Sequence, residues 1–183
     1  MTKKAICIFA EGFEEIEAVT AVDLVRRAGI DVAALGVSGI DITGSHDITI
    51  ITDGTLDDID EEYDAVIVPG GIPGVNNIAE SAEAMNLIKD MFKKGKLVAA
   101  ICAAPAAVLG KTGILEGKKV TCAPGFSEKL PEGTVFSEDR VVADSNIITS
   151  RGAGTAGEFA FAVIEYLTGR EAADKVKKAT LYR

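Results

Sequence analysis

The chain has 183 residues, 48% of them hydrophobic and 26% charged, which fits one domain over residues 1–183 with a sizeable core. Its formal net charge of −9 argues against nucleic-acid and anionic-membrane partners, because both require clustered Lys and Arg. The opening apolar run is too short for a signal peptide or a membrane span, so we expect a cytoplasmic protein. The chain has three cysteines without CxxC spacing and one histidine, which indicates neither disulfides nor a zinc site.

The first part of the chain alternates between apolar runs and helical patterns. Residues 4–10 predict a first strand, and residues 14–28 predict a helix with acids in its first turn and arginines in its last. A strand over residues 30–37 follows so closely that the two strands are expected to be parallel, joined by a right-handed crossover. The pattern then predicts a loop and edge hairpin over residues 38–55, a helical turn over residues 56–62 and a buried strand over residues 65–68.

The second part continues the alternation. An amphipathic helix is predicted over residues 76–94, a buried strand over residues 97–101 and a helix over residues 103–110 with Pro105 in its first turn. The pattern then predicts a short strand over residues 120–122, a hairpin over residues 140–149, a helix capped by Thr155 that runs to Leu167, and a last helix over residues 170–178. This alternation is typical of a three-layer α/β/α sandwich.

One stretch contains a candidate reactive residue. In residues 97–110, LVAAICAAPAAVLG, Cys102 lies between a predicted buried strand and a predicted helix. Open α/β folds bind their ligands at this edge of the sheet, and a helix N-terminus favours thiolate over thiol, so Cys102 is a candidate nucleophile with a lowered pKa. A small buried residue in an alanine-rich seam explains the same pattern. The residues of this stretch leave both interpretations open.

Residues 69–74, PGGIPG, follow another buried strand. Such a loop can present backbone N–H groups to an anion, and a plain sharp turn explains its glycines equally well.

Four segments together resemble the ThiJ/PfpI superfamily, in the branch that holds the bacterial protein YajL and the human parkinsonism-associated protein deglycase. They are AEGFEEIEAV, VIVPGGIPG, AAICAAPAAVL and SRGAGTAGEFA, and the match runs in order from Lys4 to about Lys177. The resemblance implies a flavodoxin-like, class I glutamine amidotransferase-like sandwich with a mostly parallel sheet. It also implies a homodimer, with the first helix and the edge loop as the expected contact.

The resemblance further implies a catalytic pair of Cys102, in a nucleophile elbow, and Glu17. Like-charge repulsion and burial are expected to raise the pKa of Glu17, which can then stay protonated and act as general acid/base. The backbone of Gly71 and Ala103 is placed where an oxyanion would be held, with Gly70 needed for the turn.

The other acids and the histidine position are interpreted differently. Glu14 and Glu15 are taken as helix-dipole partners on a solvated face. Ala123 stands where some relatives have a histidine, so no Cys–His dyad is expected there, and His46 in the edge loop is not a credible substitute.

The implied function is a glyoxalase or deglycase that acts on 2-oxoaldehydes such as methylglyoxal and glyoxal, or on their early adducts, without metal or organic cofactor. An alternative is a redox-sensing or chaperone-like stress protein with an oxidisable Cys102, and an amidase or peptidase is disfavoured by Ala123. Cys122 is expected to pack inside the protein, with a role as resolving thiol for Cys102 as the less favoured alternative.

Overall fold

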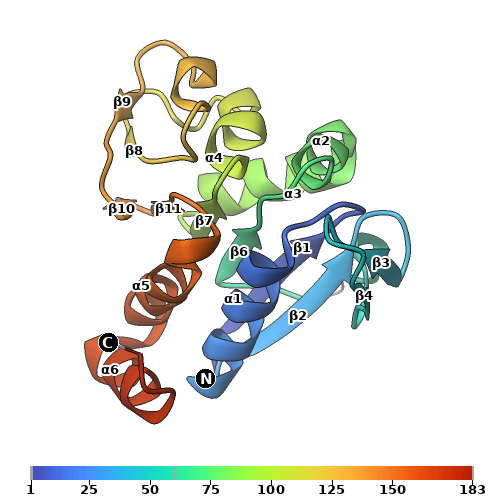
Figure 1. Ribbon diagram of the computed structural model, residues 1–183, viewed down its shortest axis with the longest axis vertical. Helices are drawn as coiled ribbons and strands as arrows, with labels where there is room; N and C mark the ends of the chain where they lie inside the picture. The colour runs from blue at the N-terminus through green and yellow to red at the C-terminus, as the bar shows by residue number, and fades with distance from the viewer. Residues whose placement is uncertain (1, 60, 183) are drawn as a thin grey trace.

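A seven-stranded sheet forms the middle layer of the computed structural model, which describes residues 2–59 and 61–182 (Figure 1). Its order is β10-β11-β7-β6-β1-β2-β5, and every neighbouring pair is parallel except β10 with β11. The strands are β1 Lys4–Phe9, β2 Asp31–Gly36, β5 Gly54–Thr55, β6 Ala65–Val68, β7 Leu97–Ile101, β10 Val141–Asp144 and β11 Ile147–Ser150. The predicted α/β sandwich with a mostly parallel sheet is confirmed.

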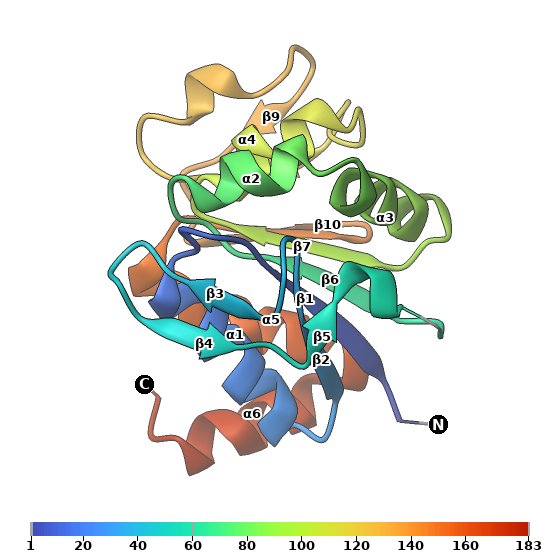
Figure 2. The ribbon, with the colours of Figure 1, turned by 90° about the vertical axis from the view of Figure 1, so that its right-hand side faces the viewer.

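Helices cover both faces of the sheet (Figure 2). One layer consists of α1 Glu15–Arg27, α5 Ala156–Thr168 and α6 Arg170–Ala179, and the other of α2 Gly74–Glu80, α3 Ala82–Lys93 and α4 Ala104–Ala107. Successive β1 side chains pack into opposite layers: Ala5, Cys7 and Phe9 pack with α1 and α5, whereas Ile6 and Ile8 pack with α2, α3 and α4. This burial on both faces explains why the sequence of β1 is one continuous apolar run.

Small elements complete the chain. Two antiparallel strands, β3 Asp41–Thr43 and β4 Thr49–Ile51, form the predicted edge hairpin, and β8 Lys119–Val120 pairs with β9 Val135–Phe136. Short 3₁₀ turns occur at Leu56–Asp58, Leu109–Lys111, Ser127–Lys129 and Ala153–Thr155. Within the described ranges, no helix is long and apolar enough to cross a membrane.

Three sequence predictions about helices are wrong in detail. The single helix expected over residues 76–94 is divided into α2 and α3, because Ser81 is extended and its side chain accepts a hydrogen bond from the Ala84 N–H at 3.1 Å. The helix expected over residues 103–110 is only α4 followed by a 3₁₀ turn. Thr155 makes no side-chain cap to α5, since its hydroxyl hydrogen-bonds to Ser150 and Gly152 instead.

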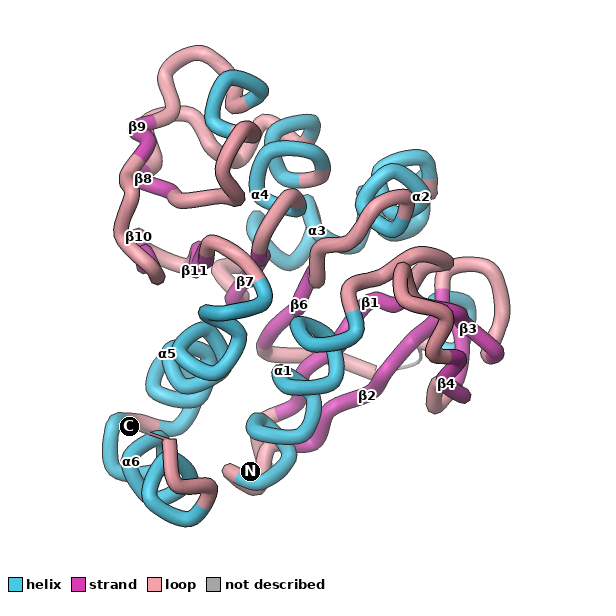
Figure 3. Tube along the Cα trace, viewed as in Figure 1, coloured by secondary structure: helices cyan, strands magenta, loops and turns pink. Residues whose placement is uncertain are grey.

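The loops after β1, β6 and β7 meet at one end of the sheet (Figure 3). These strands are neighbours and parallel, so their carboxyl ends share an edge. Ligand sites of open α/β sheets occupy this edge.

Candidate active site

Cys102 lies at the turn between β7 and α4, as predicted. Its φ of 66° falls in the left-handed region, which costs a non-glycine residue about 1–2 kcal/mol. Two other segments hold this conformation: the Cys102 N–H donates to the Ser150 carbonyl at 2.9 Å, and the Cys102 carbonyl accepts from the Ala123 N–H at 2.8 Å. The residue stays half-buried, so its sulfur is held in a strained turn at the edge of the sheet.

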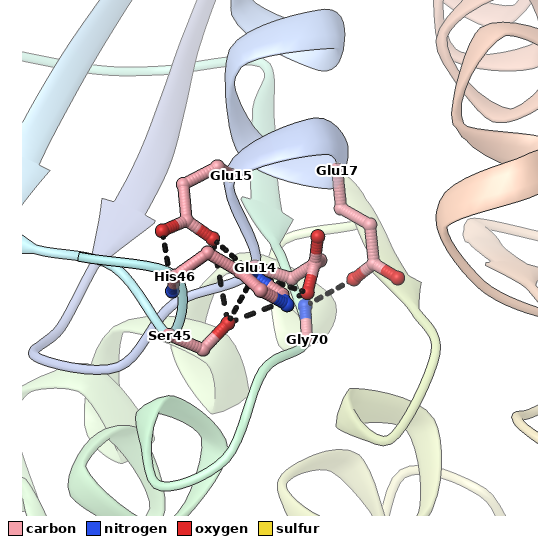
Figure 4. A network of polar contacts seen from close by, with 6 residues as sticks. All are labelled: Glu14, Glu15, Glu17, Ser45, His46 and Gly70. Carbon is pink, nitrogen blue, oxygen red and sulfur yellow. Dashed lines mark hydrogen bonds and ion pairs between the residues drawn. The ribbon is translucent and has the colours of Figure 1, made fainter. Parts of the chain in front are cut away.

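Glu17 in the first turn of α1 approaches the same point and is only 1% exposed. Its Oε2 accepts a hydrogen bond from the Gly70 N–H at 2.8 Å (Figure 4). A Cβ placed on Gly70 would lie 2.6 Å from Glu17 Oε2, 2.6 Å from Cys102 Cβ and 3.1 Å from Cys102 Sγ. Glu17 and Cys102 therefore meet across one backbone position, where only glycine leaves room for both.

The environment of Glu17 favours its protonated form. Burial raises the pKa of the Glu17 carboxyl to about 7, and the charge of Glu14 acts in the same direction, while hydrogen bonds from the Gly70 N–H and the Cys102 thiol oppose it. The direction agrees with the prediction and burial is its main cause, but the predicted repulsion by Cys102 does not contribute, because the thiol lowers the pKa of Glu17. Glu17 Oε1 is buried and has no hydrogen-bond partner among the described residues. The carboxyl can therefore hold or release a proton near neutral pH, as a general acid/base must.

The predicted low pKa of the Cys102 thiol is wrong. Burial raises the pKa of Cys102 to about 12, and the charge and hydrogen bond of Glu17 add to the rise. Hydrogen bonds from the backbone N–H groups of Ala103 and Gly71 oppose this rise but do not outweigh it. Since Glu17 repels a thiolate only while it carries charge itself, the thiolate forms most readily when the proton of the pair lies on Glu17.

Both backbone donors predicted for the oxyanion, Gly71 and Ala103, point at the sulfur. The N–H groups of Ala103 and Gly71 hydrogen-bond to Cys102 and lower its pKa. The N–H of Gly70 is instead occupied by Glu17. Gly70 is therefore not free to hold an oxyanion; its role is to orient Glu17 and to let the carboxyl and the sulfur come close.

A Cys–His pair is not formed. Ala123 is buried beside Cys102, to which its N–H donates, and it offers no ring. His46 lies with Glu15, with its Nδ1 3.0 Å from Glu15 Oε2, and Figure 4 shows Glu14 between this pair and Glu17.

Glu15 departs from the sequence interpretation. It was expected on a solvated face, but it is only 7% exposed because the edge hairpin covers it. No sequence spacing signals this contact, since the partners Glu15 and His46 are 31 residues apart.

The two other cysteines differ from Cys102 in exposure. Cys7 and Cys122 are free thiols with no exposed surface, and burial raises the pKa of both. The predicted packing of Cys122 inside the protein is confirmed. Of the three cysteines, all within the described ranges, Cys102 alone is partly exposed.

Comparisons with known proteins identify the family of this chain. The model of the DJ-1/PfpI family matches residues 3–166. The Parkinson disease protein 7 homolog of Danio rerio is 43% identical over 96% of this chain and 95% of its own length, and the glutathione-independent glyoxalase DJR-1.2 of Caenorhabditis elegans is 35% identical over 92% and 90%. The crystal structure of Drosophila melanogaster DJ-1beta superposes with a TM-score of 0.96 at 40% identity and covers 100% of both chains. The chain belongs to the DJ-1/PfpI family.

Proposed function

We propose that the protein is a cofactor-independent glyoxalase or deglycase that converts 2-oxoaldehydes, or their early adducts, to hydroxy acids. The observation that carries this proposal is the meeting of a half-buried thiol and a buried carboxyl across Gly70. A relative at 35% identity named as a glutathione-independent glyoxalase supports the same chemistry.

In the proposed reaction, the sulfur of Cys102 bonds to the aldehyde carbon of methylglyoxal, and the carbonyl oxygen takes up a proton to give a hemithioacetal. The N–H groups of Gly71 and Ala103 stabilise the developing oxyanion. Glu17 then removes the proton from this carbon and delivers it to the adjacent carbon, while the proton of the hemithioacetal hydroxyl passes to the former ketone oxygen. The product is a thioester of the hydroxy acid. Water cleaves the thioester, releases lactate and restores the thiol. The sum is methylglyoxal plus water to lactate, so no external oxidant or reductant is needed.

The test is lactate formation from methylglyoxal without added glutathione. Cys102→Ala and Glu17→Gln are each expected to reduce the rate at least 100-fold, because nucleophile and general acid/base act as a unit. Cys7→Ala, which removes a buried thiol outside the pair, is the control and should keep the rate when folded. Full activity in folded Cys102→Ala or Glu17→Gln would overturn the proposal.

A redox-sensing role is the second candidate, favoured by the accessibility of Cys102 against the buried Cys7 and Cys122. The N–H groups of Gly71 and Ala103 and a protonated Glu17 would hold the oxygens of a sulfinate. Mass spectrometry after mild peroxide treatment should find oxidation at Cys102 first, and equal oxidation of the three cysteines would eliminate this role.

We also propose a homodimer formed through α1 and the β3–β4 hairpin. Four large apolar side chains are exposed on these elements, namely Ile16, Val19, Ile48 and Ile51. The hairpin lies beside α1 in Figure 2, and the Ser45 N–H donates to the Phe13 carbonyl at 2.8 Å where the two meet. Exposed apolar side chains gathered on neighbouring elements are typical of protein interfaces.

A further inference from the structure

A group of side chains that could bind a metal ion lies where the tip of the β3–β4 hairpin meets the start of α1 (Figure 4). Glu14 and Glu15 each direct a carboxylate oxygen toward His46 Nδ1, and these three ligand atoms all lie within 4.8 Å of one another. The hydroxyl of Ser45 lies among them. None of these four side chains takes part in the reaction proposed above.

The spacing of the four atoms is close to that of a tetrahedral coordination shell. The Ser45 Oγ is 3.3 Å from Glu14 Oε2, 3.3 Å from Glu15 Oε2 and 3.2 Å from His46 Nδ1. His46 Nδ1 is 3.0 Å from Glu15 Oε2 and 3.6 Å from Glu14 Oε2. Ligands about 2.0–2.1 Å from a tetrahedral metal are about 3.3–3.4 Å apart, so five of the six edges of the required tetrahedron are present to within about 0.4 Å.

The local fold holds this arrangement in place. Glu15 Oε1 accepts a hydrogen bond from the His46 N–H at 2.7 Å, which orients the second oxygen, Oε2, toward the other donors. Gly44 allows the hairpin to pack on this carboxyl, because a Cβ at that position would overlap it. A site whose ligands are oriented by such contacts loses little conformational entropy when a metal binds.

The charge of the group also suits a cation. Two carboxylates and one imidazole are a donor set that divalent transition metals prefer.

We propose that Glu14, Glu15 and His46, with Ser45 or a water molecule as fourth ligand, bind a divalent transition metal ion such as Zn²⁺. The cysteine spacing and the single histidine of the sequence indicate no metal site, whereas these ligands come from two segments, the start of a helix and a hairpin tip. The four donors come from one chain, so one metal ion is expected per chain. The competing occupant is a proton on His46, which would be held by the same two carboxylates.

The experiment is calorimetric titration of the full-length chain with Zn²⁺, carried out on Cys102→Ser protein so that the accessible thiol does not bind the metal. We expect one Zn²⁺ per chain, with affinity at least 10-fold weaker in His46→Gln and in Glu14→Gln. These two residues are preferred to Glu15 for substitution because Glu15 is more deeply buried. Circular dichroism confirms that each variant is folded.

Asp47→Asn is the matched control. Asp47 is exposed beside His46 but lies outside the group, and its φ of 61° is a conformation that asparagine adopts readily. This variant removes the same charge as Glu14→Gln and should bind Zn²⁺ within twofold of the parent. Absence of Zn²⁺ binding, equal binding by folded His46→Gln, or an equal loss in Asp47→Asn would each overturn the proposal. The activity of Cys102→Ser is not used, so the outcome does not depend on the proposed reaction.

Discussion

Gly70→Ala tests the geometry on which the proposed reaction depends. The added Cβ would lie 2.6 Å from both Glu17 Oε2 and Cys102 Cβ. Ordinary van der Waals contact begins near 3.4 Å. These groups must therefore move apart by about 1 Å, and a displacement of about 1 Å at a reacting centre costs on the order of 100-fold in rate.

The same substitution should affect stability far less than activity. Overpacking of this kind costs about 1–3 kcal/mol, and each kcal/mol lowers the Tm of a chain of this size by about 2–4 °C. We therefore expect lactate formation to fall about 100-fold at a temperature where circular dichroism shows the variant to be folded.

Gly154→Ala is the control for this experiment. Gly154 lies in the 3₁₀ turn before α5, and a Cβ there would meet nothing within 4 Å. It should retain activity. Wild-type activity in Gly70→Ala, or a loss no larger than the unfolded fraction explains, would refute the reasoning that Glu17 and Cys102 must approach across this glycine.

Three further predictions concern pH dependence, helix capping and assembly. The pKa of Glu17 is raised from 4.5 to about 7, so the unfolded chain loses this proton at lower pH than the folded chain does. Wild type should therefore lose about 3 kcal/mol of unfolding free energy relative to Glu17→Gln as pH rises from about 4 to 8, as measured by urea unfolding. A difference that does not change with pH would contradict the argument that burial raises the pKa of Glu17. Ser81→Ala removes the cap of α3 and should cost about 1 kcal/mol of unfolding free energy with unchanged activity, whereas an unchanged Tm would show that the cap contributes nothing. Ile16→Lys places a charge on the proposed dimer face and should shift the mass measured by light scattering from that of a dimer to that of a monomer. The control Val135→Lys, at an equally exposed position on β9, should leave the mass unchanged, and a monomeric wild type would overturn the dimer proposal.

Local pattern was sufficient for most elements and for the position of the nucleophile. The apolar runs at β1, β6 and β7 identify buried parallel strands because such strands are covered on both faces, a property written into consecutive residues. The position of Cys102 at the end of β7 follows from the same pattern. The break at Ser81 was missed because apolar spacing continues across it, and only the extended conformation of one residue separates the two helices.

The sequence by itself thus determined the fold class, the order of elements and, through its resemblance to a family, the candidate pair of Cys102 and Glu17. The tertiary structure decided the protonation of that pair, because a pKa depends on burial and on charges brought close by folding. Here burial and the charge of Glu17 raise the pKa of the Cys102 thiol, which the helix terminus was expected to lower. It also decided that the Gly70 N–H serves Glu17, and that Glu15 and His46 meet although 31 residues separate them. Such contacts join distant segments, and no local period in the sequence records them.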